Sequence, residues 1–190
     1  MMRKTIWLSA VLLGAAGPAL AHPGHETSGF LHPFSGLDHM LAMVGVGLWA
    51  ALLAGRKPVI TVAVPAAFLA MMAIGAAAGF AGIKLPLVEA TILASVFVIG
   101  GLIIGAVRLP VVWAMAVVGL FAVFHGYAHA LEAPPEGAGS YILGFLAATA
   151  LLQGVGLGLG WIVHRAVGDL ALRALGGVVL AAGAVVLIAH

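Results

Sequence analysis

Long apolar stretches alternate with short polar or helix-breaking segments along this chain of 190 residues. Six of these stretches are long enough to cross a hydrocarbon core of about 30 Å as an α-helix. Gly, Pro and charged residues between them predict tight turns joining antiparallel helices. The pattern therefore predicts an all-α, polytopic membrane bundle, with spans near residues 34–54, 59–80, 86–107, 110–132, 140–163 and 170–189.

The residues before the first span, 1–21, have the pattern of a secretory signal peptide. An Arg-Lys pair at positions 3–4 precedes the apolar segment 6–16, and Ala-Leu-Ala at 19–21 supplies the small residues of a cleavage site. An uncleaved anchor is the alternative, but the apolar segment is short for a membrane span. We expect cleavage, which leaves a six-helix domain over residues 22–190 with its N-terminus outside the cytoplasm.

Charges in the predicted loops favour one orientation of this domain. Lysine and arginine accumulate in loops on the cytoplasmic side of membrane proteins. With the mature N-terminus outside, alternate loops place most cations inside and leave one lysine outside beside two acidic residues. The inner cations are Arg56, Lys57, Arg108, Arg165 and Arg173, and the outer residues are Lys84, Glu132 and Glu136. This distribution supports six spans, which also put the C-terminus outside.

The amino-acid composition excludes several classes of protein function. Hydrophobic residues make up 64% of the chain and charged residues 7%, which leaves no room for a separate soluble domain. The cations lie at helix ends rather than in a patch, so we expect the lipid bilayer, and no nucleic acid, as a partner. With no cysteine, thiolate metal sites and cysteine nucleophiles are excluded. No phosphate-binding loop is present, which argues against an ATP-driven pump, and no pattern predicts an enzyme.

Ionisable residues gather at the outer ends of three predicted spans, the first, the third and the fourth. Such residues are rare in membranes and usually functional. Any single polar residue could instead have a structural role, in which a hydrogen bond ties two helices together. For Gln153 in the fifth span both interpretations stay open: it either lines an inner path or bonds to a neighbouring helix. Convergence of several ionisable residues at one depth favours a site. They are His32, Asp38 and His39 at the first span, Glu89 at the third, and His125, His129 and Glu132 at the fourth.

These residue types suit a divalent metal ion. Neutral imidazole and carboxylate bind borderline ions such as nickel, cobalt and zinc. His125 and His129 are four residues apart and Glu132 follows three residues later, so all three project from one helical face. The adjacent Asp38 and His39 point about 100° apart on a helix. We therefore expect one of them to bind the ion and the other to orient it, without assigning which.

Four further residues are weaker candidates. Glu89, one turn into the third span, either joins the site or pairs with Lys84. The thioether of Met43 could contact a passing ion, although core packing is the favoured interpretation. His22 and His25 lie just after the predicted cleavage site. They form either a loose metal-collecting arm or a solvated tail.

The motifs that carry these residues resemble those of the HupE/UreJ family, over the whole chain including leader and six spans. The matching elements are His32-Pro33, Gly36, Asp38-His39, His125-Gly126, His129 and Glu132. The resemblance implies a small permease for nickel, or in some lineages cobalt, in the inner membrane of a Gram-negative bacterium, often linked to maturation of nickel hydrogenase or urease. It implies transport roles for His32, Asp38, His39, His125 and His129. The ion would be a transported substrate, and we expect no permanently bound cofactor.

Two other functional classes stay open. A membrane electron-transfer protein could hold haem between histidines on separate helices. However, His125 and His129 share a helix and adjoin a carboxylate, which suits a bare cation better. A metal sensor, or an assembly factor for a metalloenzyme, would also bind metal without moving it.

Overall fold

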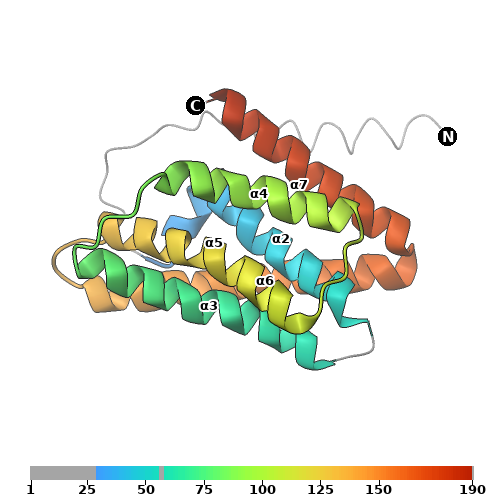
Figure 1. Cartoon of the computed structure of the whole chain (residues 1–190), viewed down its shortest axis with the longest axis horizontal. Helices are drawn as coiled ribbons and strands as arrows, with labels where there is room; N and C mark the ends of the chain where they lie inside the picture. The colour runs from blue at the N-terminus through green and yellow to red at the C-terminus, as the bar shows by residue number, and fades with distance from the viewer. Residues whose placement is uncertain (1–28, 56–57, 190) are drawn as a thin grey trace.

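The computed structural model describes residues 29–55 and 58–189, in which a short 3-10 helix, η1 (His32–Phe34), precedes six α-helices (Figure 1). The described residues contain no strand, which confirms the all-α prediction. The predicted leader, with His22 and His25, lies outside these residues. The six helices are α2 (Leu37–Ala54), α3 (Pro58–Phe80), α4 (Val88–Ile104), α5 (Val111–Glu132), α6 (Ala138–Ala166) and α7 (Asp169–Ala189).

Five of the helices are long and apolar enough to cross a membrane, and α4 is shorter. Its 17 residues extend about 26 Å at 1.5 Å per residue. The predicted third span continued to residue 107, but the helix ends earlier because Gly105 caps it and Ala106 adopts a left-handed φ of 49°. A membrane-spanning bundle is thus supported, while a complete membrane crossing by α4 stays a prediction.

Local backbone chemistry sets several of the helix ends. The first predicted span began at residue 34, but Phe34 belongs to η1, and α2 starts only after the extended Gly36. Pro110 precedes the first turn of α5, where its fixed φ and missing N–H are tolerated. Gly137 has a φ of 83°, which the absence of a Cβ permits, and it starts α6 directly after the turn from α5.

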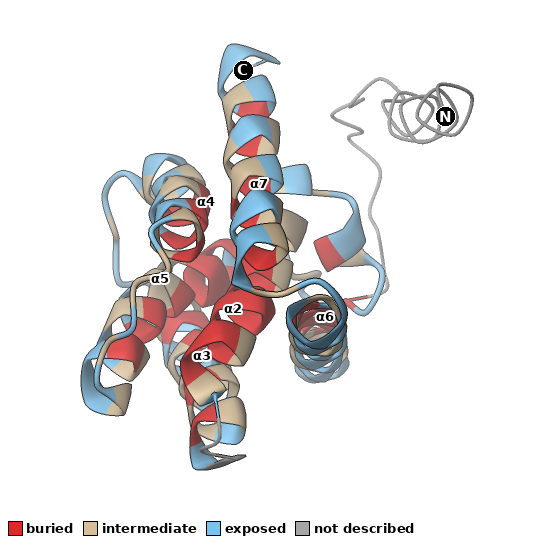
Figure 2. Cartoon of the chain, turned by 90° about the vertical axis from the view of Figure 1, so that its right-hand side faces the viewer, coloured by how far each residue is buried: buried red, intermediate tan, exposed pale blue. Residues whose placement is uncertain are grey.

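Helix α2 is the centre of the bundle. It packs against α3, α4, α6 and α7, and buried residues gather along it in the end-on view of Figure 2. Of its membrane-length segment, 56% of the residues are buried, compared with 28% in α7. A helix surrounded by protein can carry polar side chains that lipid would not tolerate.

Glycines bring two helix pairs into backbone contact. A Cβ on Gly126 of α5 would overlap the backbone of Met72 in α3. A Cβ on Gly47 of α2 would likewise overlap the backbone of Gln153 in α6. Small residues at such crossings are typical of membrane bundles. The contacts fix the depth of α5 relative to α3, and of α6 relative to α2.

The candidate residues lie at one end of the bundle, which we call the histidine end: α2 begins there, α5 ends there and α6 begins there. At the opposite end, α2 and α6 end and α5 begins. The antiparallel arrangement thus brings the two groups of ionisable residues together although nearly a hundred positions separate them in the sequence.

Candidate metal centre

The mouth of the histidine end is formed by η1 and the last turn of α5. His32 Nε2 lies 2.6 Å from Glu132 Oε2, so the ring N–H donates to the carboxylate. His129 Nδ1 lies 3.8 Å from the same oxygen. One ligand atom from each of the three residues falls within 4.8 Å of the others. Imidazole and carboxylate atoms at this spacing can converge on one divalent ion after small side-chain movements.

The first turn of α2 supplies a second His–carboxylate contact. Asp38 Oδ1 accepts a hydrogen bond of 2.8 Å from the backbone N–H of His39, and His39 Nδ1 lies 3.0 Å from it. A carboxylate on one ring nitrogen fixes the ring and directs the other nitrogen toward a metal. Gly36 leaves room for this pair, since a Cβ there would lie 3.0 Å from His39 Nδ1. The geometry therefore favours His39 as the ligand and Asp38 as the residue that orients it.

Four imidazoles continue from the mouth into the bundle, and we call them the histidine row: His32, His129, His39 and His125. Successive ring centroids are 5.1, 4.9 and 5.2 Å apart. The side chains of His125 and His129 are fully buried. Among the described residues, no partner meets the Nε2 atoms of His39, His125 and His129. Buried ring nitrogens without partners are costly, and a metal ion would satisfy them.

Hydrogen bonding and aromatic rings hold the row in place. His125 Nδ1 lies 2.9 Å from the Phe121 carbonyl oxygen, to which it donates. This assigns the proton to Nδ1 and leaves the lone pair of Nε2 available. The ring of Phe145 stacks on His129 at 4.8 Å, and Phe68 lies 5.6 Å from His125. These apolar rings restrict both orientation and access by water.

Met43 lies one helical turn after His39 and is completely buried, as core packing requires. The Thr149 hydroxyl lies 3.4 Å from Met43 Sδ and 3.6 Å from Met72 Sδ, and it can donate its one hydrogen to either. Next to the histidine row, on the side toward the opposite end of the bundle, the side chains therefore offer soft sulfur atoms and a hydroxyl group rather than charges.

One sequence candidate lies apart from this cluster. Glu89, at the start of α4, is exposed. Within the described ranges it forms no ion pair, either with Lys84 or with a histidine of the row. Six of the predicted residues thus form the cluster at the histidine end, and Glu89 lies at the same end without a direct ion pair to them among the described residues.

Sequence reasoning named only Gln153 from a third wall of the site and missed its other residues. Helix α6 presents four buried side chains at intervals of four residues: Tyr141, Phe145, Thr149 and Gln153. Tyr141 lies 5.7 Å from His32, and Phe145 stacks on His129. The signal was present in the sequence, because aromatic and polar residues at i, i+4, i+8 and i+12 lie along one helical face.

Comparisons with known proteins agree with the motifs. The family model described as HupE / UreJ protein matches residues 10–186. The chain is 42% identical over 188 residues to Protein HupE of Rhizobium leguminosarum bv. viciae, covering 95% of this chain and 97% of that protein. No solved structure matches significantly. The match covers α2, α5 and α6, the helices that form the site. The chain therefore belongs to the HupE/UreJ family.

Proposed function

We propose that this protein is an inner-membrane permease that carries divalent transition-metal ions, foremost nickel, into the bacterial cytoplasm. The observation that carries the proposal is the histidine row, in which ring nitrogens without partners are buried beneath a mouth of His32 and Glu132. Membership of the HupE/UreJ family supports the same function. Cobalt is the second substrate that this donor set suits.

In this proposal the mouth opens before an ion enters. The contact between His32 and Glu132 closes the outermost part of the site. A hydrated ion attracted by the carboxylate exchanges part of its water shell for Glu132, His32 and His129. Because the carboxylate oxygen already lies near both rings, the ion takes the place of the proton on His32 Nε2 without a large rearrangement. The displaced proton passes to water or to Nδ1 of the same ring.

The row then passes the ion inward by ligand exchange. Neighbouring rings are about 5 Å apart, so an ion held by two imidazoles can reach a third before it leaves the first. Asp38 keeps the His39 ring in the orientation that this exchange needs. Transport requires several sites of moderate strength, because one very tight site would retain the ion.

The direction follows from the membrane potential. We propose that the histidine end faces the periplasm, with both termini there, because this orientation places the arginines of the opposite end in the cytoplasm. An inside-negative potential contributes about 2.3 kcal/mol per charge per 100 mV, or about 4.6 kcal/mol for a divalent ion. Neither a chemical fuel nor a catalytic reaction is needed.

Uptake of radioactive nickel into sealed proteoliposomes tests the proposal. With an inside-negative potential the wild-type protein should accumulate nickel. His39→Ala and His129→Ala should each lower the initial rate at least tenfold, since each removes a ligand from the row. Glu136→Ala is the control, because it removes an exposed ionisable side chain that forms no ion pair among the described residues, and it should retain the wild-type rate.

The same preparation distinguishes the alternatives. Binding of nickel without accumulation would identify a sensor or an assembly factor instead of a permease. A Soret band in the purified protein would support the haem alternative. Excess cobalt or zinc as competitor would rank the substrates. In cells, loss of the protein should lower the activity of a nickel hydrogenase or urease, and added nickel should restore it.

A further inference from the structure

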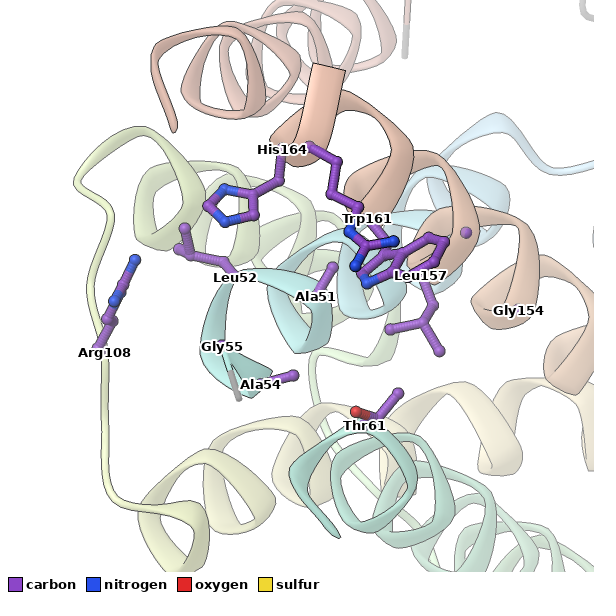
Figure 3. A pocket seen from close by; sticks show the side chains of 12 residues that line it. Ala51, Leu52, Ala54, Gly55, Thr61, Arg108, Gly154, Leu157, Trp161 and His164 are labelled. Atoms are coloured by element: carbon purple, nitrogen blue, oxygen red, sulfur yellow. The ribbon is translucent and has the colours of Figure 1, made fainter. Parts of the chain in front are cut away.

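A large cavity lies at the end of the bundle opposite the histidine end. It has a volume of about 680 Å³ and is bounded by α2, α3 and α6 (Figure 3). Apolar side chains such as Leu52 of α2 and Leu157 of α6 line its walls. Figure 3 shows Arg108 and His164 at its border, and Arg165 also lines it. The cavity therefore combines apolar walls with a cationic rim.

The cavity continues as a narrower groove of about 250 Å³ between α3 and α6, which shares Thr61, Gly154 and Leu157 with it. Apart from Thr61 and Gln153, the described residues that line the groove are apolar. One of them, Val62, is 68% exposed, so the groove opens on the outer surface of the bundle. In a membrane this surface faces lipid, and the groove suits a hydrocarbon chain.

The groove reaches well beyond the rim of the cavity. Along α3 its lining extends from Thr61 to Leu69, which is about 12 Å at 1.5 Å per helical residue. Helix α3 begins at the arginine-containing end and runs toward the histidine end. The groove therefore extends from the cationic rim toward the middle of the bilayer, as an acyl chain does from its headgroup.

Two glycines of α6 keep this space open. Gly154 and Gly158 are one turn apart and both line the cavity, and a Cβ at either position would meet no atom within 4 Å. Neither glycine is therefore required for a close contact between helices within the chain. Because glycine in a helix costs about 1 kcal/mol relative to alanine, the open space at these positions indicates room for a molecule from outside the chain.

Arg165 is the cation of the rim that is free to bind an anion. Its guanidinium lies 4.2 Å from the centre of the Trp161 ring, and tryptophan in membrane proteins favours the depth of the lipid headgroups. Among the residues that the structure describes, no carboxylate forms an ion pair with Arg165. The planar guanidinium matches the geometry of a phosphate group, so Arg165 can bind one at headgroup depth.

The other rim residues are held by one carboxylate. Asp169 lies 3.4 Å from Arg108 and 2.7 Å from Nδ1 of His164. These contacts keep both side chains at the border of the cavity. Two guanidinium groups against one carboxylate leave the rim positive even without a charge on His164. The rim therefore attracts an anion, and Arg108 can provide a second contact to it.

We propose that the cavity and the groove together bind an anionic phospholipid, whose phosphate contacts Arg165 and Arg108 while an acyl chain lies between α3 and α6. Basic pockets between membrane helices bind anionic headgroups in this way. A water-soluble phosphate could use the arginines, but it would leave the apolar groove unfilled. The inference requires only that the bundle lies in a membrane, and it does not depend on metal transport.

Lipid titration followed by native mass spectrometry tests the headgroup contact. Delipidated wild-type protein in detergent should bind phosphatidylglycerol at least tenfold more tightly than phosphatidylcholine with the same acyl chains. Arg165→Gln should raise the Kd for phosphatidylglycerol at least tenfold. Arg173→Gln is the matched control, because Arg173 is an exposed arginine of the same end that does not line the cavity. It should bind as the wild-type protein does.

A second pair of variants tests the groove. Gly154→Leu places an apolar side chain in the space that the acyl chain would occupy, and it should raise the Kd for phosphatidylglycerol at least tenfold without lowering the Tm. Gly177→Leu of α7 is its control. A Cβ on Gly177 likewise meets no atom within 4 Å, but Gly177 does not line the cavity or the groove, so lipid binding should not change.

Three outcomes overturn the inference. Equal affinity of the wild-type protein for the two lipids would show that the rim does not recognise the headgroup. Wild-type affinity in both Arg165→Gln and Gly154→Leu would place the lipid elsewhere. Inorganic phosphate bound as tightly as phosphatidylglycerol would identify a site for a free anion. None of these measurements involves nickel, so each outcome leaves the proposed transport function to its own test.

Discussion

At the residue scale, the adjacent residues Asp38 and His39 of α2 make different contacts. Asp38 contacts both the backbone N–H and the ring of His39 through one oxygen. The His39 ring lies about 5 Å from two other imidazoles. Carboxylates that orient a ligating histidine typically change metal affinity by 10–100-fold when replaced. This arrangement makes the contributions of the two residues separable by experiment.

We expect Asp38→Asn to weaken nickel binding by about 10–100-fold and His39→Ala to weaken it further. The amide can still accept the backbone hydrogen bond, but it does not fix the ring as a carboxylate does. Titration calorimetry with the purified protein measures both Kd values. Glu136→Gln is the control, since Glu136 is an exposed carboxylate that forms no ion pair among the described residues. A greater loss for Asp38→Asn than for His39→Ala would make Asp38 the ligand.

The mouth gives a second prediction at this scale. Glu132→Gln removes the negative charge next to His32 and His129 and should raise the KM for nickel uptake about tenfold, equivalent to about 1.4 kcal/mol of binding free energy. The maximal rate should change less, because the buried histidines remain. Uptake measured over a range of nickel concentrations separates the two parameters. An unchanged KM would exclude Glu132 from ion capture.

At the scale of elements, glycine contacts set the depth of the histidines. Gly126 follows His125 directly, and its Cα faces the backbone of Met72 in α3. Any side chain at this position must push α3 and α5 apart. Since His125 and His129 lie on the same part of α5, a shift of the helix also changes their distance from His39. Packing at this crossing therefore sets the spacing between the histidines of α5 and His39.

Gly126→Ala should lower both Tm and nickel affinity, because overpacking of a tight contact costs about 1–3 kcal/mol. Gly177→Ala is the matched control. A Cβ there meets no atom within 4 Å, and alanine is favoured over glycine in a helix by about 1 kcal/mol. Thermal denaturation in detergent and nickel titration check the pair. Equal stability of the two variants would contradict the packing argument.

At the scale of the whole molecule, the bundle separates two chemical environments. The histidine end contains imidazoles and carboxylates, whereas the opposite end contains arginines around a cavity. Gln153, with soft and neutral donors, lies between them. A divalent ion that crosses from the first environment to the second moves charge across the membrane, so transport should depend on the electrical potential.

Nickel uptake should therefore increase with an inside-negative potential when the histidine end faces the outside of the vesicles. Reversal of the potential should slow uptake, since about 4.6 kcal/mol per 100 mV changes sign for a divalent ion that crosses fully. Potassium gradients with valinomycin set the potential, and vesicles without protein provide the leak rate. An uptake rate that does not depend on the membrane potential would indicate an electroneutral process, such as exchange of one divalent ion for two protons.

Much of the fold could be predicted from the sequence, because lipid-facing helices need uninterrupted apolar stretches. All six α-helices occur where predicted, with ends that differ by at most three residues. The larger differences come from local backbone features, such as η1 before α2 and the left-handed Ala106 after α4. The family was also evident from the His, Asp and Glu motifs, and the comparisons confirm it.

By itself the sequence determined the helices, the residue types available to a metal ion and the helical face shared by His125 and His129, since these follow from local periodicity. Only the tertiary structure decided that Asp38 contacts His39, that Glu132 meets His32, and that α6 provides the third wall. Such contacts depend on helix rotation and depth, which are set by close packing at Gly47 and Gly126. Hydropathy carries no information about helix rotation or depth, because it describes how a helix contacts lipid and not how it packs against another helix.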